Sequence, residues 1–334
     1  MRYIDYIIRL AREVKNPPLF LYHLFHYVNK LVPYPVAKKI ANRNEYQFAK
    51  QLTGDLIVIT ADGSNQVVHP DIDIYKDGVA FICTPYPYAM EEYENPCLFY
   101  GKNINSLEPV LCPLDVQSKH TQGVHMSDPC VVTSGNKLLC IYRETQYKDD
   151  YIYLKEISIN GSDVESSERV LLLSTKGEYV LSPAVLITDT EMLMYHVHTN
   201  KYTSQLILNK FNLKDYKFIE KKILSIESEP KGYYLWHIGV NAADCKKNIE
   251  TDSSMRGLFL YVDQKDNKHL KLFMSESVDG SCWRIASEVI IPESIKQIIK
   301  FPYKSCFNPE DGRILLSFRD IKDRNRLVIL NGKR

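Results

Sequence analysis

Apolar residues follow two different patterns on either side of residue 54. Before it they recur at helical spacing in the stretches YIDYIIRLA (3–11) and LFLYHLFHYV (19–28). The sequence Asn16-Pro17-Pro18 separates these two stretches, and further prolines at positions 33 and 35 follow the second. This pattern predicts a short helical segment over residues 1–54.

After residue 54 the pattern is that of β-strands. Short apolar or alternating runs are bounded by turn residues, as in DLIVIT (55–60), GVAFICT (78–84), KLLCIYR (137–143), EMLMYHV (191–197), GLFLYVD (257–263) and RILLSFR (313–319). No alternation of strands with helices appears, which argues against a doubly wound parallel sheet. The fold class predicted for residues 55–334 is therefore all-β.

The strand-type runs recur in units of about 50 residues, a period typical of propellers and solenoids. Each unit reads as an innermost strand, a turn and a second strand, and the units begin at HPDIDIYKDG (69–78), SDPCVVTSGN (127–136), SPAVLITDTE (182–191), WHIGVNAADC (236–245) and YKSCFNPEDG (303–312). The repeat predicts a five-bladed β-propeller, in which DLIVIT adds an outer strand to the last blade and closes the ring.

The first strand of each propeller blade lines the central channel, so the residues that begin these strands meet at one mouth of the channel. Polar or aromatic side chains stand at all of these positions: His69-Pro70-Asp71, Ser127-Asp128-Pro129, Ser182-Pro183, Trp236-His237 and Tyr303-Lys304-Ser305. We therefore expect residues that are far apart in sequence to form one pocket.

Charge changes the picture mainly at the N-terminus. The whole chain has 334 residues and a net charge of +1, which gives no reason to expect nucleic acid as a partner. Residues 1–50, however, hold nine Lys or Arg against three Asp or Glu. Such a basic amphipathic segment either touches an anionic membrane surface or packs on the main domain, and we favour packing. It lacks the uninterrupted apolar core of a signal peptide, so we expect a cytoplasmic protein.

The eight cysteines form no C-x-x-C pair and several lie in apolar runs, which predicts small buried side chains in a reducing compartment. His196 and His198 share one face of a strand, and a structural role is the simpler interpretation than metal binding. The sequence contains no phosphate-binding loop and no zinc-protease motif. We therefore predict neither a cofactor nor a metal.

Several short motifs together resemble those of the five-bladed propeller glycosidases, the relatives of arabinanases, β-xylosidases and invertases. They are HPD (69–71), TPYP (84–87), ENP (94–96), SDP (127–129), WH (236–237), SVDGSCW (277–283) and YKS (303–305). The resemblance covers roughly residues 55–330, and some relatives occur near polysaccharide genes. It implies an enzyme that cleaves a glycosidic bond in an oligosaccharide or polysaccharide with a pair of carboxylates.

The resemblance also implies roles for individual residues. Asp71 matches the family's first-blade general base or nucleophile, and Asp128 matches the second-blade aspartate that orients the sugar. The third blade departs from the pattern, because Ser182-Pro183 begins it without the expected glutamate. Glu94 and Glu144 are the better candidates for the general acid, ahead of Glu178. Arg143 precedes Glu144 in sequence and is expected to keep it ionised, which suits sugar binding.

The remaining candidates are polar or aromatic residues at or near the strand starts, for which we expect contacts with the sugar. They are His69, Tyr86, His125, Arg143, Ser182, Trp236, His237, Tyr303 and Lys304. For His237 a satisfied core histidine is an equally good interpretation.

Three functions remain open on the sequence alone. Hydrolysis of a glycan comes first. Glycosyl transfer in surface polysaccharide assembly is favoured by the basic N-terminal segment, the lack of a signal peptide and the missing third-blade glutamate. A non-catalytic glycan-binding propeller is the third, since fold does not fix function.

Overall fold

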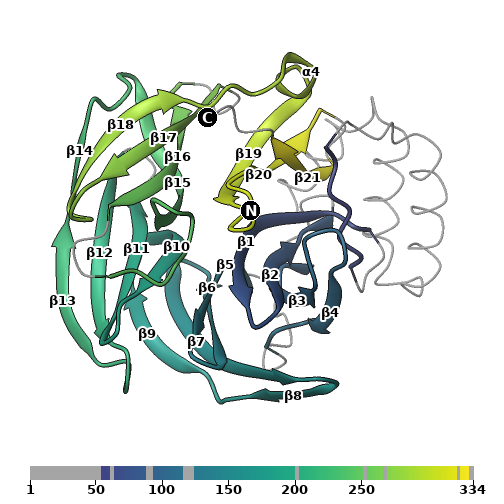
Figure 1. Ribbon diagram of the computed structural model, residues 1–334. Helices are drawn as coiled ribbons and strands as arrows, with labels where there is room; N and C mark the ends of the chain where they lie inside the picture. The colour runs from purple at the N-terminus through teal and green to yellow at the C-terminus, as the bar shows by residue number, and fades with distance from the viewer. Residues whose placement is uncertain are drawn as a thin grey trace.

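The computed structural model describes residues 54–60, 64–87, 93–115, 124–199, 203–250, 254–265, 269–321 and 324–330. Five β-sheets are arranged around a central axis, as the sequence repeat predicts (Figure 1). The helical prediction for residues 1–54 and the membrane contact proposed for residues 1–50 fall almost entirely outside the described residues. In the described part, no helix combines the length and the apolar character needed to span a bilayer.

The first three blades are antiparallel sheets whose strands follow one another outward from the axis. Blade 1 consists of β1 (Val67–Tyr75), β2 (Gly78–Pro85), β3 (Cys97–Gly101) and β4 (Glu108–Leu111). Blade 2 consists of β5 (Val124–Ser134), β6 (Lys137–Gln146), β7 (Asp149–Asn160) and β8 (Asp163–Ser166), with β9 (Val170–Thr175) also paired to β7. Blade 3 consists of β10 (Tyr179–Ile187), β11 (Glu191–Thr199), β12 (Ser204–Asn212) and β13 (Phe218–Ile223).

The last two blades follow the same plan with small changes. Blade 4 consists of β15 (Tyr233–Ala242), β16 (Met255–Asp263), β17 (Leu270–Ser277) and β18 (Cys282–Glu288), to which the short β14 (Ser225–Glu227) pairs in parallel. The helix α4 (Glu293–Lys296) leads to blade 5, which consists of β19 (Ile299–Phe307), β20 (Ile314–Asp320) and β21 (Asn325–Leu330).

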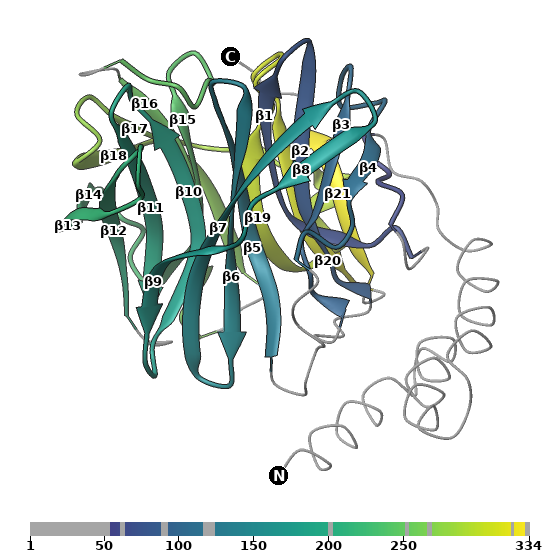
Figure 2. The same ribbon diagram turned by 90° about the horizontal axis from the view of Figure 1, so that it is seen from below.

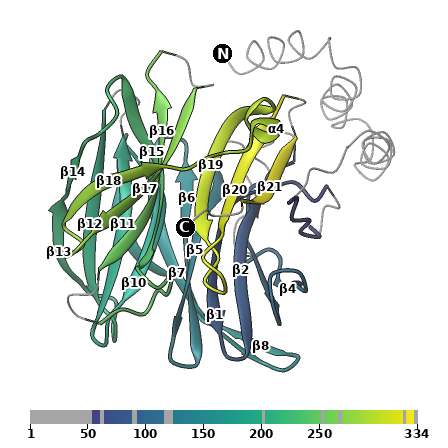
Figure 3. The ribbon, with the colours of Figure 1, turned by 45° about the horizontal axis from the view of Figure 1, so that its top comes forward.

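The inner strands β1, β5, β10, β15 and β19 stand next to one another around the axis, as Figures 2 and 3 show from two further directions. They are buried along nearly their whole length, since each has a sheet face on both sides. Apolar clusters fill the spaces between blades. One of them joins Tyr75 and Ile82 of blade 1 to Met126 and Tyr142 of blade 2.

The start and the end of the described chain meet in blade 5. Asp55 forms an antiparallel bridge with Val328, Leu56 N–H donates to Leu327, and Ile329 N–H donates to Gly54. The side chain of Arg326 adds an ion pair to Asp55 at 2.5 Å. Residues 54–56 thus lie against the outer edge of β21, which agrees with the predicted closure, although the contact is a short bridge rather than a full strand.

One smaller prediction, that most cysteines are buried, is confirmed by the packing. All eight cysteines lie in the described residues, none forms a disulfide, and six of them are buried. Trp283 is fully buried and donates from its indole nitrogen to Gly280, so it packs on the turn of its own blade.

Candidate active site at the propeller axis

The inner strands of blades 1, 2 and 3 share one unusual local conformation. His69, Asp128 and Ser182 each precede a proline and each has a positive φ, at 52°, 50° and 52°. In each blade this residue and its proline stand together opposite a single residue of the second strand, forming a β-bulge. Such a conformation costs on the order of 1–3 kcal/mol for a residue other than glycine and is concentrated at functional sites. Bulges next to active sites re-aim a side chain.

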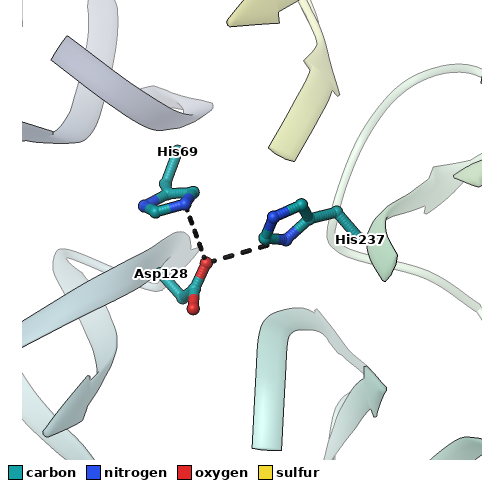
Figure 4. A group of neighbouring side chains, drawn as sticks. All are labelled: His69, Asp128 and His237. Carbon is teal, nitrogen blue, oxygen red and sulfur yellow. Dashed lines mark ion pairs between the residues drawn. The ribbon is translucent and has the colours of Figure 1, made fainter. Parts of the chain in front are cut away.

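Here the re-aimed side chains meet on the axis (Figure 4). Nε2 of His69 lies 3.4 Å from Oδ1 of Asp128, and Nδ1 of His237 lies 3.8 Å from the same oxygen. The hydroxyl of Ser182 is hydrogen-bonded to Nδ1 of His237. The ring of Tyr303 stands edge-on to His69 with centroids 5.3 Å apart. All five blades therefore contribute to one group, as the strand-start positions predict. We call His69, Asp128, Ser182 and His237 the axial cluster.

Asp128 supplies the negative charge of the axial cluster. Its carboxylate is fully buried and lies 3.0 Å from the guanidinium of Arg143. Burial alone would raise the pKa of Asp128, but His69, Arg143, His237 and Lys304 lower it, so the carboxylate is held ionised. Neither of its oxygens has a well-aligned hydrogen bond within the described part of the chain. A buried carboxylate with spare acceptor capacity is unusual in a purely structural position.

The two histidines of the cluster are held neutral. Burial lowers the pKa of His69 to about 4, and Arg143 and Lys304 add to this while Asp128 opposes it. Burial also places the pKa of His237 well below its usual value. At neutral pH the cluster thus holds one charged carboxylate and two uncharged imidazoles.

Lys304 fixes the cluster from the side of blade 5. It occupies the bulge position that proline fills in blades 1 to 3, and it is fully buried. Its ammonium donates to the carbonyls of Pro129 and Pro183, at 2.8 and 2.9 Å. These prolines directly follow Asp128 and Ser182, so one side chain joins the strand starts of three blades.

His69, Asp128 and His237 present ligand atoms within 4.8 Å of one another, a spacing that suits a metal ion. Two observations weigh against a cation at this point. Arg143 and Lys304 already place positive charges beside the carboxylate. In addition, Nδ1 of His237 is already bonded to Ser182. We therefore assign no metal to this cluster.

Asp71 lies two residues further along β1 than His69 and has a different environment. Its carboxylate accepts hydrogen bonds from Val131 N–H at 3.0 Å and from the ammonium of Lys247 at 2.5 Å. By strand register Asp71 corresponds to Cys130 and Ala184, not to Asp128. The catalytic role expected for Asp71 stays a prediction, and both observations weigh against it.

Lys247 reaches Asp71 from a loop of blade 4, between β15 and β16. The loop is anchored to blade 3, because Ile187 donates to the carbonyl of Lys247 and Ile249 donates back to Ile187. The buried ammonium also donates to the carbonyl of Val131 at 2.7 Å. Burial works to lower the pKa of Lys247, but Asp71, Cys130 and Asp73 raise it. We call Asp71, Val131 and Lys247 the lysine plug.

Two glutamates, Glu94 and Glu144, lie beside blade 2, and their carboxylates contact different side chains. Glu94 is 5% exposed, and its Oε2 lies 3.3 Å from Nε2 of His125. Its charge also raises the pKa of Arg143, after the larger effects of burial, Asp128 and Asp150. Glu144 instead pairs with Arg169 at 2.8 Å and accepts a bond from Gln146 at 2.5 Å.

The expected pairing of Arg143 with Glu144 is wrong. Neighbouring residues of a strand point to opposite faces of the sheet. Arg143 accordingly faces blade 3, where it lies near Asp128 and 3.7 Å from Asp150. Glu144 faces blade 1 with Tyr142, whose hydroxyl donates to Asp115.

Aromatic rings occupy the side of the mouth formed by blades 4, 5 and 1. Trp236 stands edge-on to Phe301, with centroids 6.2 Å apart, and Phe301 is 5.4 Å from Tyr303. Tyr86 is 6.1 Å from Tyr303, and the guanidinium of Arg319 lies over both tyrosine rings. Tyr86, Trp236 and Phe301 are partly exposed, whereas Tyr303 between them is buried.

His196 and His198 lie outside the axial cluster. His196 is buried and bonded to Asn209, which supports the structural interpretation. His198 bonds to Glu178, a glutamate whose side chain is 54% exposed.

A surface cavity of about 510 Å³ lies between β17, β18, α4 and β19 and is lined mainly by apolar residues with Glu288 and Lys296. It holds no group resembling the axial cluster.

Sequence reasoning missed Lys247, Arg169, Asp115 and Asp150. Lys247 lies in the irregular insertion of blade 4, where no periodicity applies. For Asp150 the sequence did contain a signal, because strand alternation places Asp150 on the same face as Arg143 and Glu144 on the opposite face. Since Arg143 cannot then reach Glu144, the same alternation indicates that another cation pairs with Glu144. That cation is Arg169.

No protein-family model matches the sequence, and no curated protein matches it. Solved structures do match the fold. A thermostable family-43 glycoside hydrolase is similar with a TM-score of 0.57 at 11% identity, covering 79% of this chain and 88% of that one. An endo-arabinanase of family 43 from Bacillus licheniformis gives 0.51 at 10% identity, covering 84% and 96%.

A third similar structure is a family-43 β-xylosidase/α-arabinofuranosidase from a compost microbial metagenome, determined with xylotriose in a calcium-free form. Its TM-score is 0.53 at 10% identity, covering 84% of this chain and 96% of that one. At these identities the similarity shows the fold. The chain has the five-bladed propeller architecture of the family-43 glycoside hydrolases.

Proposed function

We propose that this protein is a glycoside hydrolase-like enzyme that cleaves a glycosidic bond at the mouth of the propeller axis. The observation that carries the proposal is the convergence of strained strand starts from different blades on one ionised carboxylate, Asp128. The similar structures are enzymes of this class, including an endo-arabinanase and a β-xylosidase/α-arabinofuranosidase. We therefore take arabinose- and xylose-containing oligosaccharides as the first substrates to test.

Glycoside hydrolysis needs one carboxylate that remains charged and one group that delivers a proton to the leaving oxygen. In the proposed reaction Asp128 is the charged group, and it stabilises the positive charge that develops on the sugar ring. Glu94 is the proton donor in this scheme, because it is buried beside His125 and its charge acts on Arg143, which pairs with Asp128. Glu144 is the weaker candidate, since it is tied up in an ion pair with Arg169.

The aromatic side of the mouth fits the same function. Sugar rings present flat C–H faces that stack on aromatic side chains, and Trp236, Phe301 and Tyr86 are partly exposed there. Arg319 and the hydroxyl of Tyr303 supply polar contacts on the same side. We propose that the glycan lies on this aromatic row with the bond to be cleaved directed toward Asp128.

A product assay by mass spectrometry tests the proposal. Wild type, Asp128→Asn and Asp320→Asn are incubated with arabino- and xylo-oligosaccharides, with and without sugar-nucleotide donors. Asp320 is a matched control, since it is buried and paired with Arg324 but stands in blade 5 away from the axial cluster. We expect shortened products from wild type and Asp320→Asn only. Lengthened products, or binding without any product, would overturn hydrolysis of these glycans.

A further inference from the structure

The axial cluster contains one carboxylate where glycoside hydrolysis ordinarily uses two. Asp71, the other aspartate near the axis, is bound to Lys247 in the lysine plug. Glu94 stands to the side, against His125. The position on blade 1 that corresponds to Asp128 is filled by His69, with the same backbone conformation, the same following proline and the same bulge.

The two nitrogens of His69 have different surroundings. Nε2 faces the carboxylate of Asp128 at 3.4 Å. Nδ1 is buried and has no hydrogen-bond partner among the described residues, although buried polar atoms are nearly always paired. The negative charge of Asp128 attracts the proton to the nearer ring nitrogen, Nε2, by electrostatics, since the 3.4 Å contact is not a well-aligned hydrogen bond. The lone pair is then on Nδ1.

We propose that His69 is the general base of the reaction, with Asp128 as the positioning residue that holds its proton on Nε2. This assignment rests on the proposed function and names the group that activates the water. In the step, the water oxygen attacks the anomeric carbon while the bond from that carbon to the leaving oxygen breaks. Nδ1 of His69 takes one proton from the water, and Glu94 gives one proton to the leaving oxygen.

The basicity of His69 suits this task. Burial brings its pKa to about 4, which is close to that of an ordinary aspartate, about 3.9. The imidazole is therefore unprotonated at neutral pH and has about the basicity of an ordinary aspartate side chain. The charged and titratable groups that face it are Asp128, Arg143, His237, Tyr303 and Lys304.

His69 differs from His196, a buried histidine outside the axial cluster. His196 on β11 is also buried and also carries a strongly lowered pKa, about 3, but Nε2 is bonded to the amide of Asn209 and no carboxylate stands beside it. It lies on the second strand of blade 3, opposite the Ser182-Pro183 bulge, and is not itself a bulged residue. A substitution there is a matched control for the loss of a buried imidazole.

Activated aryl glycosides distinguish the loss of the general base from the loss of the general acid. Wild type, His69→Asn, Glu94→Gln and His196→Gln are assayed with 2,4-dinitrophenyl arabinofuranosides and xylosides, whose leaving group needs no proton, and with the corresponding oligosaccharides. Asparagine suits position 69 because it tolerates a positive φ. We expect His69→Asn to lose about 10²–10⁴-fold in kcat on both kinds of substrate. Glu94→Gln is expected to lose activity only on the oligosaccharides, and His196→Gln on neither.

The outcomes are distinguishable. If wild type cleaves no glycoside, the proposed function fails and the assignment of His69 fails with it. If wild type cleaves the glycosides and His69→Asn remains within a few-fold of it, hydrolysis stands and His69 is not the base. A second readout is independent of turnover. Nitrogen NMR of histidine-labelled protein should show His69 protonated on Nε2 at neutral pH, and protonation on Nδ1 would overturn the proposal.

Discussion

Asp128 and Asp71 are both buried at the starts of inner strands and both have a lowered pKa, yet they belong to different kinds of site. Asp71 is held by two hydrogen bonds, because a backbone amide and an ammonium donate to its Oδ2 at 3.0 and 2.5 Å. Asp128 has charged and polar neighbours but no well-aligned hydrogen bond within the described residues.

The difference teaches how to separate a structural acid from a functional one. Burial and a perturbed pKa mark both residues, so neither property alone identifies the active carboxylate. Backbone strain and spare acceptor capacity mark only Asp128, since Asp71 lies past the bulge in regular strand register. The four predictions below test this contrast, in order of expected effect.

The largest effect is expected from breaking the lysine plug. Lys247→Met leaves the carboxylate of Asp71 buried without its cation, which should lower the free energy of unfolding by about 3–5 kcal/mol. Chemical denaturation followed by circular dichroism measures this. The double variant Lys247→Met with Asp71→Asn has no buried charge left and should recover part of the loss. A double variant no more stable than Lys247→Met would show that the pair is not coupled.

The next effect is expected on activity rather than on stability. Asp128→Asn keeps the size of the side chain but removes the charge, and we expect kcat to fall about 10²–10³-fold, or roughly 3–4 kcal/mol in the barrier. Asp71→Asn should reduce stability while the remaining folded enzyme keeps most of its kcat. The reverse result, with Asp71→Asn inactive and Asp128→Asn active, would return the catalytic role to Asp71.

A smaller effect is expected from acid. His69 has a lower pKa in the folded protein, about 4, than its ordinary value, about 6.5, so the unfolded chain binds more protons between these values. Stability is therefore complete above pH 6.5 and is lost as the pH falls toward 4, by about 2 kcal/mol between pH 7 and pH 5 from this residue alone. The stability of His69→Asn should depend less on pH by this amount.

Asp73 provides the control for the sign of this effect. Burial raises its pKa to about 6, so the folded protein holds a proton that the unfolded chain releases, and this residue favours folding as the pH falls. Asp73→Asn should therefore lose stability on acidification more steeply than wild type. Urea denaturation at pH 5 and pH 7 measures the change in the free energy of unfolding for both variants. A smaller loss of stability in Asp73→Asn than in wild type would contradict the prediction.

The smallest effect is expected at Glu144. Because its carboxylate pairs with Arg169 on the face of blade 2 that looks toward blade 1, Glu144→Gln should change kcat on oligosaccharides less than tenfold. Glu94→Gln, close to Arg143, should lose much more. Equal losses in the two variants would show that the ion pair with Arg169 does not remove Glu144 from the chemistry.

The blade pattern was readable from sequence because it depends on local chemistry. Turn residues and strand-type runs repeat in each unit, and X-Pro pairs mark the starts of the inner strands of blades 1 to 3, so the convergence of His69, Asp128 and Ser182 followed from the fold alone. The assignment within HPD was less certain. Choosing Asp71 over His69 required the position of the bulge, and a shift of one residue reverses which side chain faces the axis.

The sequence repeat could not predict the ion-pair partners of Asp71 and Glu144. Lys247 comes from a loop with no repeat, and its partner Asp71 is 176 residues away in sequence. The pairing of Glu144 with Arg169 spans 25 residues and depends on β9 lying beside β7. Such contacts depend on how blades are placed in space, which a single sequence does not display.

The bridge between Asp55 and Val328 has a consequence for the order of events during synthesis. Blades 1 to 4 are contiguous in sequence, so each can pair its strands as it leaves the ribosome. Residues 54–56 are made before any blade but find their partner only after β21 has been made. Blade 5 is therefore the last to be completed, and until then the nascent ring keeps an unpaired strand edge that can recruit other chains.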